Sequence, residues 1–147
     1  MGVYSVLAGV LARLGVVNTA RPEYLRVGRL GEDAAAAHLA GLGFRVITRN
    51  ARVRMGEADI VAQDGDTHVI VEVKSRVRDD AAPERSNTVA PEQSVTRRKM
   101  ATLRRIAAWL AQRNGWATVR IDVVAVEIGR VEGGLRVLTV RHLRDVR

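Results

Sequence analysis

The chain has 147 residues, a length that fits one domain with its own hydrophobic core. Its formal net charge of +8 favours a polyanionic partner such as nucleic acid, although an arginine-rich proteome would give the same charge. The absence of cysteine excludes disulfides and thiolate metal sites, and it fits a reducing, cytoplasmic environment.

The first 20 residues form an apolar segment with a helical repeat. The repeat consists of Val3, Leu7, Val10, Leu14 and Val17. The stretch is too short and too interrupted for a membrane span, and it lacks the basic start and small-residue cleavage site of a secretory signal. We therefore expect an apolar extension or helix over residues 1–20, a single domain over residues 21–147, and no membrane partner.

The rest of the chain alternates between helical and strand patterns. In order, we predict a helix over 23–43, strands over 44–50, 57–63 and 68–74, a loop over 77–92, a helix from Ser94 or Thr96 to about 114, and strands over 119–126 and 135–140. Asp64-Gly65-Asp66 is a strong hairpin signal between the second and third strands. This order predicts an α/β fold, in which helices flank a mixed sheet in three α-β-α layers. No Gly-rich phosphate loop is present, which argues against a nucleotide-hydrolysing motor.

One acid and one lysine stand together in the third predicted strand. Only two of the 24 basic residues are lysines, and one of them, Lys74, follows Glu72 by two positions in an apolar run. Residues two apart in a strand face the same side. A lysine can lose its proton when desolvated, whereas a guanidinium group cannot. The pair is therefore a candidate for chemistry, although an ordinary ion pair would give the same pattern.

A further carboxylate on the second strand extends this cluster. The hairpin brings Asp59 close to Glu72, and two carboxylates at that distance repel unless a cation lies between them. Mg²⁺, or Mn²⁺, is the hard cation that suits such oxygen ligands. Lys74 would then orient or deprotonate the attacking water, or stabilise the developing negative charge. A salt bridge that closes the sheet edge explains one acid and one lysine, but it does not explain a surplus of buried carboxylates.

Glu32 is the third candidate acid. Its neighbours at helical spacing are Gly28, Ala35 and Ala36, which form a small-residue face. A glutamate on this face would reach the same cluster and either ligate the metal or pair with Lys74. The alternative is that the alanine-rich helix has no defined apolar side, which would leave Glu32 solvated.

Basic side chains flank the acids and begin the second long helix. Candidates for phosphate contacts are Arg52, Arg54, Arg76, Arg78, Arg97, Arg98 and Lys99. Arginines on an exposed helix can also serve only for solubility. Because aromatic residues make up 3% of the chain, we expect recognition of backbone shape rather than base sequence.

Several separated motifs resemble one known family. They are Gly31-Glu32, Gly43-Phe44, Arg49-Asn50, Gly56-Glu57-Ala58-Asp59-Ile60-Val61-Ala62, Val71-Glu72-Val73-Lys74-Ser75-Arg76, Gln93-Ser94-Val95 with Lys99, and Arg120-Ile121-Asp122-Val123-Val124-Ala125. In this order they resemble the bacterial YraN-type family of predicted endonucleases over about residues 23–128. That family is similar to Holliday-junction resolvases and belongs with the PD-(D/E)xK, restriction-endonuclease-like nucleases.

The resemblance implies a role for each candidate residue. It implies a restriction-endonuclease-like sheet, metal-binding acids at Asp59, Glu72 and Glu32, and a catalytic lysine at Lys74. Gln93 corresponds to a glutamine near the active site of some relatives. We therefore expect a metal-dependent endonuclease that acts on DNA rather than RNA, with branched or structured DNA indicated only by analogy to resolvases. A homodimer follows from the same analogy, since resolvases make two cuts. The alternatives are a catalytically silent nucleic-acid-binding module and an interaction subunit of a DNA-processing complex.

Overall fold

The computed structural model describes residues 21–78 and 95–147. In chain order, the elements are α1 (Glu23–Gly41), β1 (Arg45–Val53), β2 (Gly56–Asp64), β3 (Thr67–Arg78), α3 (Arg97–Asn114), β4 (Val119–Val131) and β5 (Gly134–Leu143). This is the predicted α/β class, a mixed sheet with a helix on each side, and it agrees with a three-layer α-β-α arrangement. The extension expected over residues 1–20 lies outside the described residues, as do Gln93, Ser94 and most of the predicted loop.

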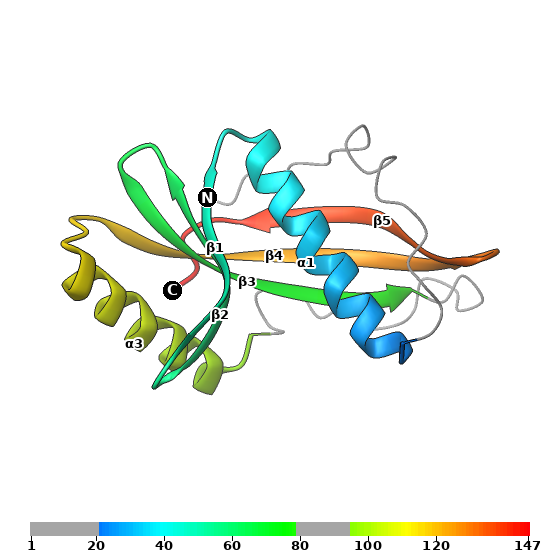
Figure 1. Ribbon diagram of the computed structural model, residues 1–147, viewed down its shortest axis with the longest axis horizontal. Helices are drawn as coiled ribbons and strands as arrows, with labels where there is room; N and C mark the ends of the chain where they lie inside the picture. The colour runs from blue at the N-terminus through cyan, green and yellow to red at the C-terminus, as the bar shows by residue number, and fades with distance from the viewer. Residues whose placement is uncertain (1–20, 79–94) are drawn as a thin grey trace.

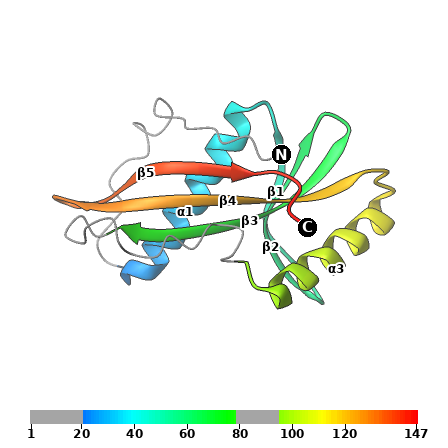
Figure 2. The same cartoon turned by 180° about the vertical axis from the view of Figure 1, so that it is seen from behind.

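The five strands form one sheet in the order β1-β2-β3-β4-β5. β3 and β4 are parallel, and the other neighbours are antiparallel. α3 lies in the connection between the two parallel strands, as such a crossover requires. α1 crosses in front of β3, β4 and β5 in Figure 1 and behind them in Figure 2, so it covers one face of this part of the sheet. α3 packs against β2 and β4.

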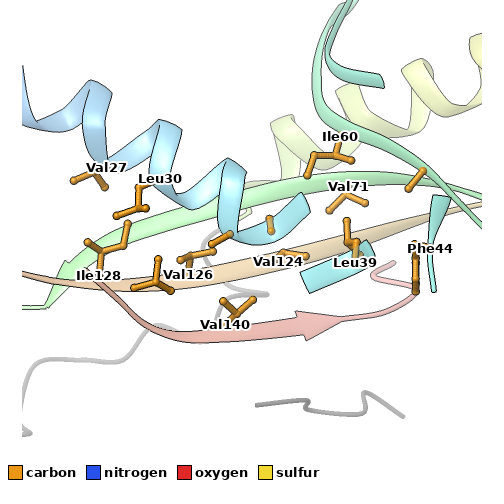
Figure 3. Packing of buried hydrophobic residues seen from close by; sticks show 14 of the residues in the cluster. Val27, Leu30, Leu39, Phe44, Ile60, Val71, Val124, Val126, Ile128 and Val140 are labelled. Atoms are coloured by element: carbon orange, nitrogen blue, oxygen red, sulfur yellow. The ribbon is translucent and has the colours of Figure 1, made fainter. Parts of the chain in front are cut away.

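Each helix covers its own aliphatic core. On the α1 side, Leu30 and Leu39 pack over Val71, Val124 and Val126, as Figure 3 shows. On the α3 side, the core includes Ile70, Leu103, Ile106 and Val123. Branched aliphatic side chains suit a sheet that is buried on both faces. The two cores bury both faces of the central strands β3 and β4, and β3 carries the candidate acid and lysine.

The strands are longer than the sequence pattern predicted. β3 and β4 stay paired as far as Arg78↔Gly129, whereas we expected the strands to end at 74 and 126. The alternating arginines at positions 76 and 78 resemble the composition of a polar loop, but parallel pairing with β4 satisfies the backbone groups on one side of this part of β3. The first helix ends at Gly41 rather than 43. Thr96, one of the two predicted caps, accepts a hydrogen bond from the Lys99 backbone N–H at 3.1 Å and begins α3.

A buried ionic network braces the sheet around Asp122. The Asp122 carboxylate is fully buried and accepts hydrogen bonds from Arg120 Nε at 3.0 Å and from the Asp145 backbone N–H at 2.9 Å. His142 Nε2 lies 2.9 Å from the other carboxylate oxygen of Asp122. Burial would raise the pKa of Asp122, but the hydrogen bonds from His142 and Arg120 keep that pKa below its usual value. Asp122 therefore has a structural role, in which it joins β4 to β5 and to the C-terminal residues.

Within residues 21–78 and 95–147, neither helix has an apolar stretch long enough to cross a bilayer.

Candidate active site

The site forms where β2 and β3 separate. Their ladder runs from Asp64↔Thr67 to Ile60↔Val71, and β3 then continues beside β4 while β2 turns away from it (Figure 1). At the point of separation, Asp59 Oδ2 accepts a hydrogen bond from the Val73 backbone N–H at 2.7 Å. The Asp59 carboxylate thus accepts a hydrogen bond from a backbone N–H of β3 that no described strand pairs with. This bond fixes the acid against β3.

Glu72 is the buried centre of the cluster, with 3% of its surface exposed. Lys74 Nζ donates to Glu72 Oε1 at 2.8 Å, and Lys99 Nζ lies 2.9 Å from Glu72 Oε2. Glu72 Oε2 accepts no hydrogen bond of good geometry from the described residues, so its contact with Lys99 is an ion pair. The only two lysines of the chain therefore neutralise the same carboxylate.

Asp59 is held in an unfavourable electrostatic environment. Burial, together with the negative charge of Glu72, raises its pKa to about 6. The hydrogen bond from Val73 and the charge of Lys99 act in the opposite direction, while Glu32 again raises the pKa. The three predicted acids are therefore close enough to influence one another. The Asp59 carboxyl therefore keeps its proton at higher pH than an ordinary aspartate does.

Glu32 reaches the cluster from α1. Its Oε2 accepts a hydrogen bond from Asn50 Nδ2 at 3.1 Å, and Arg49 lies 3.7 Å from the same oxygen. Gly31 lets the helix lie directly against β3, because a Cβ at position 31 would stand 1.7 Å from Ser75 Oγ. This close approach brings Glu32 to the acids of the sheet.

A groove of about 480 Å³ opens between α1 and β3 at the cluster. Glu32, Asp59 and Lys74 line it, whereas Glu72 lies buried beneath and is not part of the wall. Its other described lining residues are Glu23, Tyr24, Val27, Gly28, Val73, Ser75, Arg76 and Val77. The groove gives a ligand access to two of the acids and to the ammonium group of Lys74.

The predicted basic residues separate into two groups. Six of the seven are exposed, namely Arg52, Arg54, Arg76, Arg78, Arg97 and Arg98. Among these, Arg52 pairs with Glu57 at 3.0 Å, and Arg76 pairs with Glu127. Lys99, by contrast, is half-buried and turns toward Glu72, with a second contact to the Glu57 carbonyl at 3.3 Å. Its place in the cluster was not predicted, although the rarity of lysine in the chain was a signal for it.

The donor set suits a hard cation with few protein ligands. The described residues contain no group of three or more His, Asp or Glu side chains gathered closely enough to hold an ion. Mg²⁺ is often bound through one or two carboxylates and keeps several waters, so Asp59 with Glu72 fits it. The raised pKa of Asp59 also marks a carboxylate that a cation would stabilise. Because each Glu72 oxygen faces a lysine, ligation by Glu72 requires one ammonium group to move away.

Comparison with known proteins places the chain in a family. A family profile described as "Uncharacterised protein family UPF0102" matches residues 31–126. Three relatives are each described as a UPF0102 protein. The relative from Mycolicibacterium vanbaalenii is 49% identical over 122 residues, which are 82% of this chain and 92% of the relative. The relative from Mycobacterium marinum is 44% identical over 110 residues, or 72% and 84% of the two chains. The relative from Mycobacterium avium is 41% identical over 126 residues, which are 83% of this chain and 90% of the relative. The chain therefore belongs to the UPF0102 family, the bacterial YraN type.

Proposed function

We propose that the protein is a metal-dependent endonuclease that hydrolyses phosphodiester bonds in DNA. The observation that carries this proposal is the pairing of buried Glu72 with both lysines of the chain, beside Asp59 with its raised pKa. Gathering acids in this way costs stability, because buried charge is unfavourable unless it is fully compensated. Groups with such perturbed pKa values concentrate at functional sites.

In the proposed mechanism, each residue of the cluster has a separate task. Asp59 and Glu72 would hold Mg²⁺ or Mn²⁺, with Glu32 as a further oxygen donor at the groove. The bound ion would lower the pKa of a coordinated water and neutralise charge on the phosphate. Lys74, whose side chain is 36% exposed, reaches the groove and can orient the water or donate to a phosphate oxygen. Lys99 would position Glu72 from α3 and balance its charge.

The basic surface supports nucleic acid as the substrate. Six exposed arginines from the predicted set flank the cluster or begin α3, and the chain has a net charge of +8. Arginines at such positions neutralise phosphates without reading sequence. We favour DNA over RNA, and branched or structured DNA with a homodimeric enzyme, from the likeness to resolvases.

One observation favours a second function, a binding module without catalysis. With both of its oxygens against ammonium groups, Glu72 is already neutralised without a metal ion. A cluster that balances its own charge can serve stability alone. In that case the arginine surface would bind nucleic acid, or a partner protein would complete the site.

A cleavage assay separates these two functions. The purified protein is incubated with Mg²⁺ and with duplex, single-stranded and branched DNA and the corresponding RNA. We expect Glu72→Gln and Lys74→Ala to lose at least about 100-fold in rate. Asp33→Asn is the matched control, because Asp33 is a partly exposed acid next to Glu32 that does not line the groove and pairs with Arg49 at 2.8 Å. Equal binding by all variants with no cleavage by any of them would favour the binding module.

A further inference from the structure

The groove beside the acid cluster extends beyond the acids themselves. It continues past Glu32 and Asp59 along the first half of α1 and the outer end of β3. On one wall stand Tyr24, Val27 and Gly28, and on the other Val73, Ser75 and Val77. These wall residues are apolar or small apart from the Tyr24 hydroxyl, and Glu32 and Asp59 lie at one end of the groove.

Among the described strands, none pairs with the groove side of β3 beyond Val71. The Val73 N–H points to this side, because it donates to Asp59. Backbone direction alternates along a strand, so the N–H and C=O groups of Ser75 and Val77 point the same way. Such an edge can exchange hydrogen bonds with a flat polar ligand.

The α1 wall offers an aromatic ring and open space. Tyr24 is 73% exposed, although the chain has only five Phe, Trp and Tyr residues in total. At Gly28 no atom lies within 4 Å of the position where a Cβ would stand, so the groove has a clear floor there. An exposed ring beside an open floor suits the stacking of a planar group.

Size and charge decide between possible occupants. A volume of about 480 Å³ lies within the usual range for small-ligand pockets, so it holds one nucleotide and is too small for a base-paired helix. Glu23 and Arg76 also line the groove, but Glu23 is paired with Arg130 at 2.7 Å and Arg76 with Glu127, so both charges are largely compensated. Glu32 on the wall can accept a hydrogen bond from an amino group of a base. The occupant that fits is thus an uncharged base on a strand whose phosphate lies at the acids.

We propose that this groove binds an unpaired nucleotide next to the scissile phosphate, with its base stacked on Tyr24. The substrate class is then DNA with a single-stranded segment, such as a flap, a gap or a fork, rather than continuous duplex. This inference rests on the proposed endonuclease function, because it takes the acid cluster as the place where the phosphate is cut.

Binding without cleavage tests the inference separately from the activity. Fluorescent DNA probes, one a continuous duplex and one carrying a single-stranded flap, are titrated with the full chain in Ca²⁺, and gels confirm that the probes stay intact. A 2-aminopurine base in the flap reports stacking. We expect the flap probe to bind at least about fivefold more tightly than the duplex, since one stacked base contributes that much or more. Its fluorescence should also be quenched.

Variants of the groove complete the test. Tyr24→Ala and Gly28→Leu should remove both the preference and the quenching, whereas Tyr24→Phe should keep them. Gly28→Ala adds only one methyl group on the same helix and should leave binding nearly unchanged. Leu25→Ala is the matched control, because Leu25 is 49% exposed but does not line the groove. Equal affinity for both probes, no binding of either, or full preference in Tyr24→Ala would overturn the inference. Flap preference with no cleavage in Mg²⁺ would support the groove and contradict the endonuclease.

Discussion

Replacing Asp59 by asparagine should stabilise the metal-free protein at neutral pH. In the folded protein the pKa of Asp59 is raised from 3.8 to about 6, so the folded state holds this proton more tightly than the unfolded state does. The fold is therefore favoured most below the ordinary pKa, and it loses stability as the pH rises toward 6. An asparagine side chain would remove this loss, because it carries no charge.

The magnitude follows from the two pKa values. The difference between 3.8 and about 6 corresponds to about 3 kcal/mol, at about 1.36 kcal/mol per pH unit. The asparagine carbonyl can still accept the Val73 N–H, but a neutral acceptor is weaker by about 1 kcal/mol. We therefore expect a net gain of about 2 kcal/mol above pH 7, or about 4–8 °C in Tm for a chain of this size.

Thermal unfolding from pH 4 to pH 8 in EDTA measures this effect. The advantage of Asp59→Asn should be present at pH 7.5 and should vanish near pH 4. Asp33→Asn is the control, because the partly exposed ion pair of Asp33 with Arg49 contributes at most about 1 kcal/mol. Added Mg²⁺ should raise the Tm of the original protein but not that of Asp59→Asn. A destabilised Asp59→Asn, or a gain that does not depend on pH, would refute the reasoning.

Three further predictions follow from other contacts. Lys99→Met should raise the pKa of Asp59, because the Lys99 charge lowers it. The rising limb of the pH–rate profile for cleavage would then move to higher pH. If the limb did not move, Lys99 would not act on the pKa of Asp59. Gly31→Ala should destabilise the fold by about 1–3 kcal/mol in urea unfolding, through the clash with Ser75, and Ser75→Gly in the same chain should restore stability. Asp122→Ala should cost about 3–5 kcal/mol, because it leaves buried cationic and polar partners unpaired. A loss below about 1 kcal/mol would show that the network is dispensable.

Local patterns in the sequence were sufficient to predict much of the fold and the meeting of the acids. Apolar runs marked the strands, and Asp64-Gly65-Asp66 marked the hairpin that sets Asp59 against Glu72. Because side chains alternate between the faces of a strand, Glu72 and Lys74 were expected on the same face of β3. In the structure Lys74 Nζ lies 2.8 Å from Glu72 Oε1. These features depend on residues near one another in the chain, so a single sequence carries them.

Features that depend on long-range packing were not predicted. The contact of Lys99 with Glu72 depends on how α3 crosses the sheet, and we expected Lys99 on a phosphate-binding surface. The outer end of β3 is a strand because distant β4 pairs with it, which its alternating arginines conceal. The groove exists because β2 pairs with β3 only from Ile60 onward, whereas β3 continues past Val71, and no local pattern marks that separation. The functional roles of the site residues stay predictions.

A crystal structure with Mn²⁺ would show whether the acid cluster holds a divalent cation, because the anomalous signal locates the ion. We expect one ion held by carboxylate oxygens of Asp59 and Glu72 at about 2.0–2.2 Å, with Lys74 or Lys99 displaced from the oxygen that it contacts. Glu72 still bound by both lysines, with no ion between the two acids, would contradict this expectation.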